Sequence, residues 1–167
     1  MRGFLARYKF HFFIAVVAIV GYWQVSLFRY TLKWDDIDQY FPWRYFVSEC
    51  LRNGVLPFWN PYQHWGYAMH ADPQSGVWYP VVWIISLLHG YDVYANQFDF
   101  MLHIVLAGIG MYLLVNQFVN DRKAAFIIGC SYMLSGFFVG NAQHLTFIVS
   151  GAWIPFVIYY YSQMYTS

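Results

Sequence analysis

Charged residues are scarce in this sequence of 167 residues. Only 10% of its residues are Asp, Glu, Lys or Arg, whereas 60% are hydrophobic and 24% are aromatic. Ordinary globular proteins contain about 25% charged residues. So few charges cannot cover a water-soluble surface, and so many aromatic residues argue against a disordered chain. The composition therefore predicts an integral membrane protein.

Several functional motifs are missing as well. The net charge is only +1 and no basic stripe occurs, so the sequence predicts no nucleic-acid partner. No glycine-rich nucleotide loop of the GxGxxG or GxxxxGK[ST] type is present, which disfavours a nucleotide-using cytoplasmic enzyme. The two cysteines, Cys50 and Cys130, form no disulfide framework and no CxxC pair, and no HExxH motif supports zinc.

Four apolar stretches are expected to cross the membrane as helices, at 10–28, 98–119, 124–140 and 145–161. Their lengths are close to the ~20 residues that a helix needs to span a bilayer. The apolar segment 77–88 is shorter, and runs of ~10–14 residues are more often re-entrant or interfacial. We therefore expect an all-α fold with about four transmembrane helices.

The basic residues give an independent test of this topology. Arg2, Arg7 and Lys9 precede the first stretch, and Arg122-Lys123 precede the third. Basic residues tend to remain cytoplasmic. Both clusters share one side of the membrane only if 77–88 does not cross. The sequence thus predicts a cytoplasmic N-terminus and a large outer loop over residues 29–97.

The outer loop holds the densest acidic cluster of the chain, Asp35-Asp36-Ile37-Asp38. Adjacent residues of a helix cannot face the same way, so one of Asp35 and Asp36 is expected to point into a cavity. A carboxylate in that position suits a general base for a hydroxyl acceptor. Asp36 and Asp38 are also candidate ligands for a divalent cation such as Mg²⁺ or Mn²⁺. The remaining alternative is a solvated cluster that faces lipid headgroups.

An amphipathic helix is predicted over 42–53, lying on the membrane surface. Its apolar positions recur at helical spacing: Trp43, Phe46, Val47, Cys50 and Leu51. Its polar positions fall largely on the opposite side: Arg44, Ser48, Glu49 and Arg52. An arginine fork suits phosphate, so Arg44 and Arg52 are candidates for binding a donor phosphate, and the alternative is that they anchor the helix to headgroups.

The helix is followed by a long irregular segment that continues to Gly76 and is rich in hydrogen-bonding and stacking groups. Long ordered loops tend to be functional. Its substrate-binding candidates, with one from the turn between the last two spans, are Trp59, Asn60, His64, Asp72, Gln74 and His144. His103 lies inside a span, where we expect a hydrogen-bonded packing histidine that faces the bundle interior.

Three motifs follow one another in the outer loop: DDIDQYFPWR at 35–44, NGVLPFWNPY at 53–62 and ADPQSGVWYP at 71–80. In this order they resemble the N-terminal part of the bacterial YfhO-like membrane proteins, within the GT-C glycosyltransferase superfamily. The resemblance implies a GT-C-like N-terminal part whose first outer loop carries surface helices and an acidic motif. By position in that motif, Asp36 is the first choice for base or metal ligand, followed by Asp35 and then Asp38.

The resemblance also implies a function and a location. The donor would be a sugar on a polyprenyl-phosphate carrier, transferred at the outer face of the bacterial cytoplasmic (inner) membrane. Such enzymes usually have more than four crossings, so we expect the chain to be the N-terminal part of one. The alternative is a non-catalytic small membrane subunit that packs on a larger membrane complex. A transporter is disfavoured because few ionisable residues lie within the spans.

Overall fold

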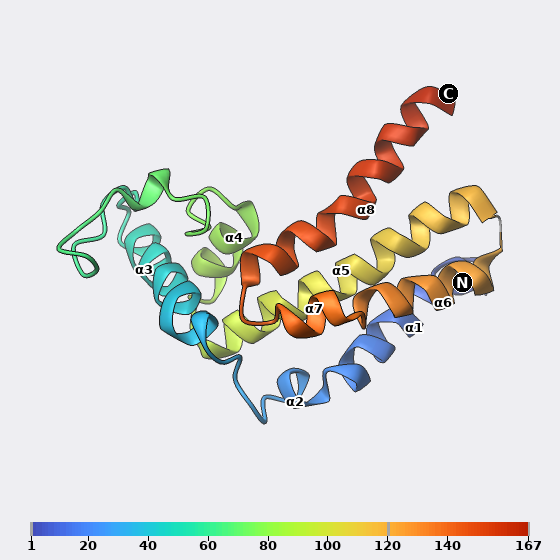
Figure 1. Ribbon diagram of the computed structural model, residues 1–167, viewed down its shortest axis with the longest axis horizontal. Helices are drawn as coiled ribbons and strands as arrows, with labels where there is room; N and C mark the ends of the chain where they lie inside the picture. Colours follow the sequence, from blue (N-terminus) through green and yellow to red (C-terminus); the bar gives the residue numbers. More distant parts are fainter. Residues whose placement is uncertain (1, 120, 167) are drawn as a thin grey trace.

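The computed structural model describes residues 2–119 and 121–166, and this described part is helical without a strand. The long helices are α1 (Arg2–Gly21), α5 (Val93–Val119), α6 (Arg122–Met133) and α8 (Leu145–Thr166). The remaining α-helices are α2 (Trp23–Ser26), α3 (Phe41–Arg52), α4 (Pro80–Leu88) and α7 (Gly136–Gly140). Helix α3 is as long as α6. Figure 1 shows the long helices as a bundle, with α3, α4 and their loops gathered at one end.

Three segments are long and apolar enough to cross a membrane: Val93–Val119, Arg122–Gly140 and Leu145–Tyr165. The apolar part of α1, Tyr8–Gly21, is shorter. The molecule is therefore an all-α protein whose helices are compatible with a multi-pass membrane protein. The count of four crossings stays a prediction.

The first helix does not run from 10 to 28, as the apolar run predicted. It ends at Gly21, and the chain then makes the single turn α2 before Phe28 adopts a left-handed φ of 54°. A Cβ at Gly21 would lie 2.6 Å from Leu134 Cδ2. The glycine therefore permits a close approach between the end of α1 and the α6–α7 junction, which an uninterrupted apolar run could not reveal.

The later spans also differ at their ends. Helix α5 begins at Val93 rather than 98, because the Asp92 carboxylate accepts a hydrogen bond from Ala95 N at 2.8 Å and caps the helix. The predicted helix 124–140 is divided into α6 and α7. Helix α8 continues to Thr166 and contains Pro155.

Segment 77–88 forms α4, a helix of nine residues. At ~1.5 Å per residue such a helix is about 14 Å long, against ~30 Å for a hydrocarbon core. Pro80 starts it, and Val82 and Ile85 pack into the core. That this segment does not cross the membrane stays a prediction.

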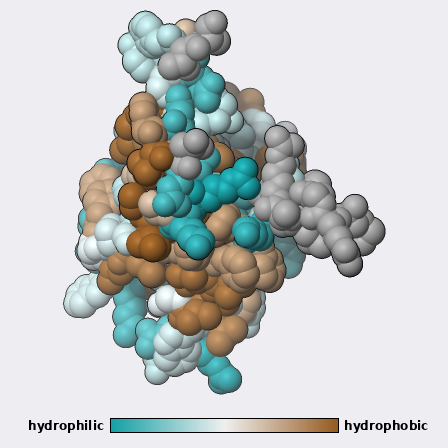
Figure 2. Space-filling view, turned by 90° about the vertical axis from the view of Figure 1, so that its right-hand side faces the viewer, coloured by the Kyte–Doolittle hydropathy of each residue, from teal (hydrophilic) through white to brown (hydrophobic). Residues whose placement is uncertain are grey.

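Helix α5 lies at the centre of the bundle, and half of its most apolar stretch is buried. Its buried residues Phe100, Ile104 and Ala107 belong to the same core as Ile14 of α1 and Ile148 of α8. The bundle carries its polar groups at its two ends. Asp121, Arg122 and Lys123 are exposed at the α5–α6 turn. Figure 2 looks onto that end, where hydrophilic side chains gather amid hydrophobic ones.

Close contact between α5 and α6 depends on glycine. A Cβ at Gly129 would lie 2.7 Å from the Gly108 carbonyl oxygen, and backbone cannot move aside as a flexible side chain can. We expect Gly129→Ala to lower the free energy of unfolding by about 1–3 kcal/mol, the usual cost of overpacking. Denaturant titration in a neutral detergent measures this effect.

The matched variant is Gly140→Ala, which adds the same methyl group where nothing lies within 4 Å. It should leave stability nearly unchanged. Equal stabilities for the two variants would contradict the close α5–α6 contact.

Candidate functional site

Asp36 and Asp38 of the acidic cluster lie in a single π-helical turn, η1 (Asp36–Tyr40), which Asp35 precedes and which leads directly into α3. Trp34 enters it with a φ of 59°, an uncommon value for a bulky residue. Asp35 keeps its carboxylate 53% exposed, whereas Asp36 is 2% exposed. The two adjacent carboxylates thus face different surroundings, as predicted, and π-helical turns are frequent at functional sites.

Asp35 borders an open cavity of about 400 Å³ at the surface of the segment between α1 and α5. The described residues that line it are Asp35, Asp38, Gln39, Trp43, Gln63 and His64. His144, from the turn between α7 and α8, places its Nδ1 3.5 Å from Asp35 Oδ2. This cavity, called the acidic cavity below, therefore joins three of the predicted residues directly and a fourth through Asp35.

Asp36, the first choice for the catalytic base, points away from this cavity. Its Oδ2 accepts a hydrogen bond from Asn96 Nδ2 of α5 at 2.7 Å. The space that it borders is about 10 Å³, room for a single water at most. A residue so enclosed cannot reach a hydroxyl acceptor. The structure therefore leaves Asp35, the second choice, as the carboxylate of the triplet that meets both open space and His144.

Burial raises the pKa of Asp36 to about 7, and the opposing effects of the Asn96 hydrogen bond and the Arg44 charge are smaller. The buried oxygens Asp36 Oδ1 and Asn96 Oδ1 both lack a hydrogen-bond partner among the described residues. Both oxygens are hydrogen-bond acceptors, so neither can donate to the other. A proton on the Asp36 carboxyl supplies the missing donor. Near neutral pH, Asp36 therefore exchanges between a neutral and a charged form.

Arg44 is 2% exposed and donates to Asp99, which is fully buried on α5. The guanidinium also donates to the Tyr91 hydroxyl at 2.8 Å, and that hydroxyl donates to Asp99 Oδ2 at 2.5 Å. Burial alone would lower the pKa of Arg44, but the interactions with Tyr91 and Asp99 outweigh it and raise the pKa. Arg44 remains charged, and the Asp99 carboxylate already balances its charge. The buried guanidinium therefore cannot bind a donor phosphate.

The burial of Arg44 also corrects the predicted orientation of α3. Its supposedly polar side is partly inside, because Ser48 is 1% exposed and its Oγ accepts a hydrogen bond from Tyr91 N at 3.0 Å. Helix α3 packs against α4, and its Arg44 pairs with Asp99 of α5. That α3 lies on a membrane surface stays a prediction. The boundaries predicted for it were correct to within one residue.

The polar network continues along α5. His103 is fully buried, and its Nδ1 lies 2.7 Å from the Asp99 carbonyl oxygen. Its Nε2 lies 2.5 Å from the Tyr79 hydroxyl oxygen, and Trp153 Nε1 donates to Tyr79 at 2.8 Å. The prediction of a hydrogen-bonded packing histidine is confirmed.

The remaining predicted residues lie outside the acidic cavity. Arg52 donates to the His89 carbonyl oxygen at 3.1 Å. Asn60 is buried and its Oδ1 accepts from Tyr62 N at 3.0 Å, while Trp59 is 58% exposed.

Asp72 and Gln74 belong to one tight turn, in which Asp72 Oδ1 accepts from Gln74 N at 2.8 Å. The Gln74 carbonyl oxygen accepts from the Thr146 hydroxyl at 3.4 Å, which brings this turn to the start of α8.

Sequence reasoning missed Asp99, Tyr91 and Asn96. The signal for Asp99 was its spacing of four residues from His103, which places both on one face of an apolar helix. Nothing in the sequence indicated that Arg44, 55 residues away, is the partner. Nothing in the sequence indicated that the acidic cavity is also lined by Gln39, Trp43 and Gln63.

A shared cation site for Asp36 and Asp38 does not fit the structure. Asp36 is turned inward to Asn96, whereas Asp38 lines the open cavity. No group of three or more His, Cys, Asp or Glu side chains suited to a metal occurs within the described residues. We therefore derive no step through a metal ion.

No protein-family model matches the sequence, and neither a curated protein nor a solved structure matches it. The candidate site therefore rests on its own geometry.

The raised pKa of Asp36 predicts a pH-dependent stability. Between pH 3.8, the ordinary value, and about 7, the folded chain binds more protons than the unfolded chain. The stability contributed by Asp36 should therefore fall as pH rises through this window and level off above it, by up to roughly 4 kcal/mol. Unfolding in neutral detergent at several pH values measures the slope.

The variant Asp36→Asn should remove this contribution. Asp38→Asn, which neutralises an exposed carboxylate in the same turn, should retain it. An unchanged pH slope in Asp36→Asn would rule out titration of this group.

The buried pair predicts strong coupling between α3 and α5. Arg44→Met leaves Asp99 as an uncompensated buried charge, and Asp99→Leu does the same to Arg44, so each should cost about 3–5 kcal/mol. The double variant should cost about 1–3 kcal/mol less than the sum. The exposed residues Lys123 and Asp38, changed to Met and Leu, form a control pair whose effects should add. Additive effects at Arg44 and Asp99 would refute the pairing.

Proposed function

We propose that this chain is the N-terminal part of a membrane glycosyltransferase, which takes a sugar from a polyprenyl-phosphate carrier at the outer face of the bacterial cytoplasmic membrane. The observation that supports this most is the acidic cavity, where Asp35 meets open space at the end of the bundle opposite the exposed Arg122 and Lys123. If basic residues remain cytoplasmic, this end faces outward. The motif at 35–44 that resembles the GT-C proteins lies at this cavity.

The chemistry of the cavity suits a sugar hydroxyl. Carboxylates accept hydrogen bonds from hydroxyl groups, and the amides of Gln39 and Gln63 both donate and accept. Its volume of about 400 Å³ lies within the ~300–1,000 Å³ common for small-molecule sites. The indole of Trp43, which is 5% exposed, forms part of the wall.

In the proposed reaction Asp35 is the general base. Its carboxylate takes the proton of the acceptor hydroxyl as that oxygen attacks the anomeric carbon. The bond between this carbon and the phosphate oxygen breaks, and polyprenyl phosphate leaves with the bonding electrons, so the configuration inverts. His144, 3.5 Å from Asp35, holds the carboxylate toward the cavity. Asp36 positions the turn through Asn96 and takes no part in proton transfer.

A second candidate is a non-catalytic membrane subunit, and the C-terminal half of α8 favours it. This half leaves the bundle in Figure 1, and its side chains are widely exposed: Val157 65%, Tyr160 62%, Met164 76% and Tyr165 74%. Hydroxyl-bearing tyrosines among them would suit contact with further helices better than contact with lipid tails.

The base assignment predicts a severe loss of transfer in Asp35→Asn. General bases contribute about 10²–10⁴-fold to a rate, so we expect at least a hundredfold fall in the initial rate. The assay measures label transfer from a polyprenyl-phosphate sugar by membranes that contain the chain within its complete protein or assembly.

The control is Asp92→Asn, which removes an exposed carboxylate outside the cavity and should retain most activity. Transfer that persists in Asp35→Asn at the control's rate would contradict the base assignment and favour the subunit role.

A further inference from the structure

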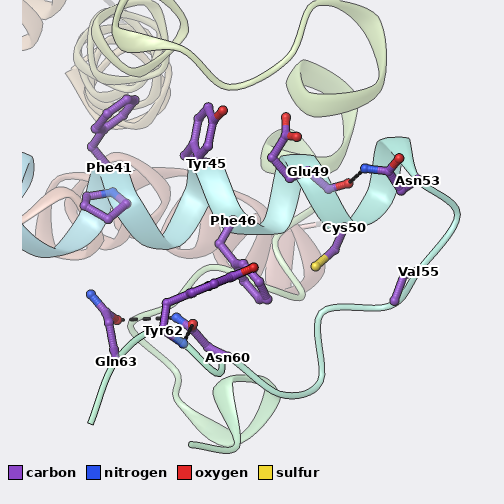
Figure 3. Close-up of a pocket in the computed structure, with 11 residues that line it drawn as sticks. Phe41, Tyr45, Phe46, Glu49, Cys50, Asn53, Val55, Asn60, Tyr62 and Gln63 are labelled. Carbon is purple, nitrogen blue, oxygen red and sulfur yellow. Dashed lines mark hydrogen bonds between the residues drawn. The ribbon is translucent and has the colours of Figure 1, made fainter. Parts of the chain in front are cut away.

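A second cavity, called the aromatic groove below, lies between α3 and the loop that follows it. Its volume is about 710 Å³. The described residues that line it are Phe41, Pro42, Tyr45, Phe46, Glu49, Cys50, Asn53, Val55, Asn60, Tyr62 and Gln63. Figure 3 shows the helix forming one wall and the loop forming the other. Gln63 is common to this groove and the acidic cavity.

Aromatic side chains dominate the walls of the groove. Phe41 and Tyr45 follow each other along α3, with ring centroids 6.2 Å apart. On the other wall Tyr62 approaches Phe46 edge-on, with centroids 6.0 Å apart. Tyr62 is 82% exposed and Tyr45 is 48% exposed. These rings therefore present accessible faces rather than filling a core.

The loop that carries Tyr62 is held in place by backbone and side-chain hydrogen bonds. Asn60 and Tyr67 exchange two backbone hydrogen bonds of 3.0 Å. The buried Asn60 side chain accepts from Tyr62 N at 3.0 Å and donates to Gln63 Oε1 at 3.4 Å. The wall that faces α3 is thus formed before any ligand arrives, which lowers the entropic cost of binding.

The groove carries negative charge alone among its described lining residues. Glu49 is its only ionisable carboxylate, and none of the described lining residues is basic. Within the described part of the chain the Glu49 carboxylate forms no ion pair, and the nearby Arg52 donates to His89 instead. Burial, and then the Glu49 charge, raise the pKa of the Cys50 thiol, so this cysteine remains neutral.

We propose that the aromatic groove binds an ammonium group carried on an apolar body, as a quaternary ammonium or a protonated amine. The faces of Tyr45, Phe46 and Tyr62 attract a cation through their quadrupoles, and such aromatic sites recognise choline-like groups. The Glu49 carboxylate, one helical turn beyond Tyr45, neutralises the charge. The same carboxylate disfavours an anionic ligand such as polyprenyl phosphate. The groove is therefore a site distinct from the proposed transfer site and does not depend on it.

The test uses choline and its uncharged isostere 3,3-dimethylbutan-1-ol as probes. Binding is measured by saturation-transfer NMR on the purified chain in nanodiscs of phosphatidylglycerol. Choline should bind at least tenfold more tightly than the alcohol. Equal binding of the two probes, or no binding of choline, would overturn the proposal.

Variants assign binding to the groove. Glu49→Gln and Tyr62→Ala should each weaken choline binding about tenfold, whereas Tyr62→Phe, which keeps the aromatic face, should bind as the unaltered chain does. Asp38→Asn removes an equal charge from the acidic cavity and should have little effect on choline. Unchanged binding in Glu49→Gln, or an equal loss in Asp38→Asn, would place the site elsewhere. Loss of glycosyl transfer in Asp35→Asn with choline binding intact would separate the two sites.

The source of the ammonium group is resolved by adding phosphatidylethanolamine to the nanodiscs. Competition with choline identifies a lipid headgroup as the occupant, and unaltered choline binding identifies a free amine or quaternary ammonium compound. Both results require that choline binds in phosphatidylglycerol alone.

Discussion

The buried pair of Arg44 and Asp99 connects α3 to the bundle, and the position of the candidate site depends on it. Two charges taken out of water are costly unless they meet each other and further hydrogen-bond partners. Tyr91 supplies such a partner by accepting from Arg44 and donating to Asp99. Because Asp99 lies on the central helix, this pair fixes α3, and the η1 turn that leads into α3 is fixed with it.

One buried cation, Arg44, lies near two buried carboxylates, Asp99 and Asp36. This explains why the carboxylates of the acidic cluster have different surroundings. Arg44 pairs directly with Asp99. Asp36 receives a neutral amide donor from Asn96, and its burial favours the uncharged form. Asp35, one residue earlier, remains in contact with solvent and with His144. Asp36 thus serves packing, and the preceding residue, Asp35, faces the acidic cavity. The two residues have different roles, although the sequence shows them as one acidic run.

Hydrophobic periodicity predicted the helices better than it predicted their surroundings. The pattern of Trp43 and Val47 located α3 to within one residue, because both face the core. The same pattern assigned Arg44 and Ser48 to the polar side, since periodicity counts a paired arginine as a solvated one. At the end of α1, Gly21 lies close to Leu134, a residue distant in sequence that no local pattern connects to it. The choice between Asp35 and Asp36 depends on Asn96, a residue that no local pattern connects to the cluster.

The acidic cavity and the aromatic groove depend on the same support. Trp43 of α3 lines the acidic cavity, whereas Tyr45 and Phe46 of the same helix line the aromatic groove. Gln63 borders both, and its Oε1 accepts hydrogen bonds from Trp43 Nε1 and from Asn60 Nδ2. A displacement of α3 would therefore alter both cavities together. Since α3 is held by a buried charge pair rather than by apolar packing alone, loss of either charge would release both walls, whereas changes in the exposed rings would alter the groove alone.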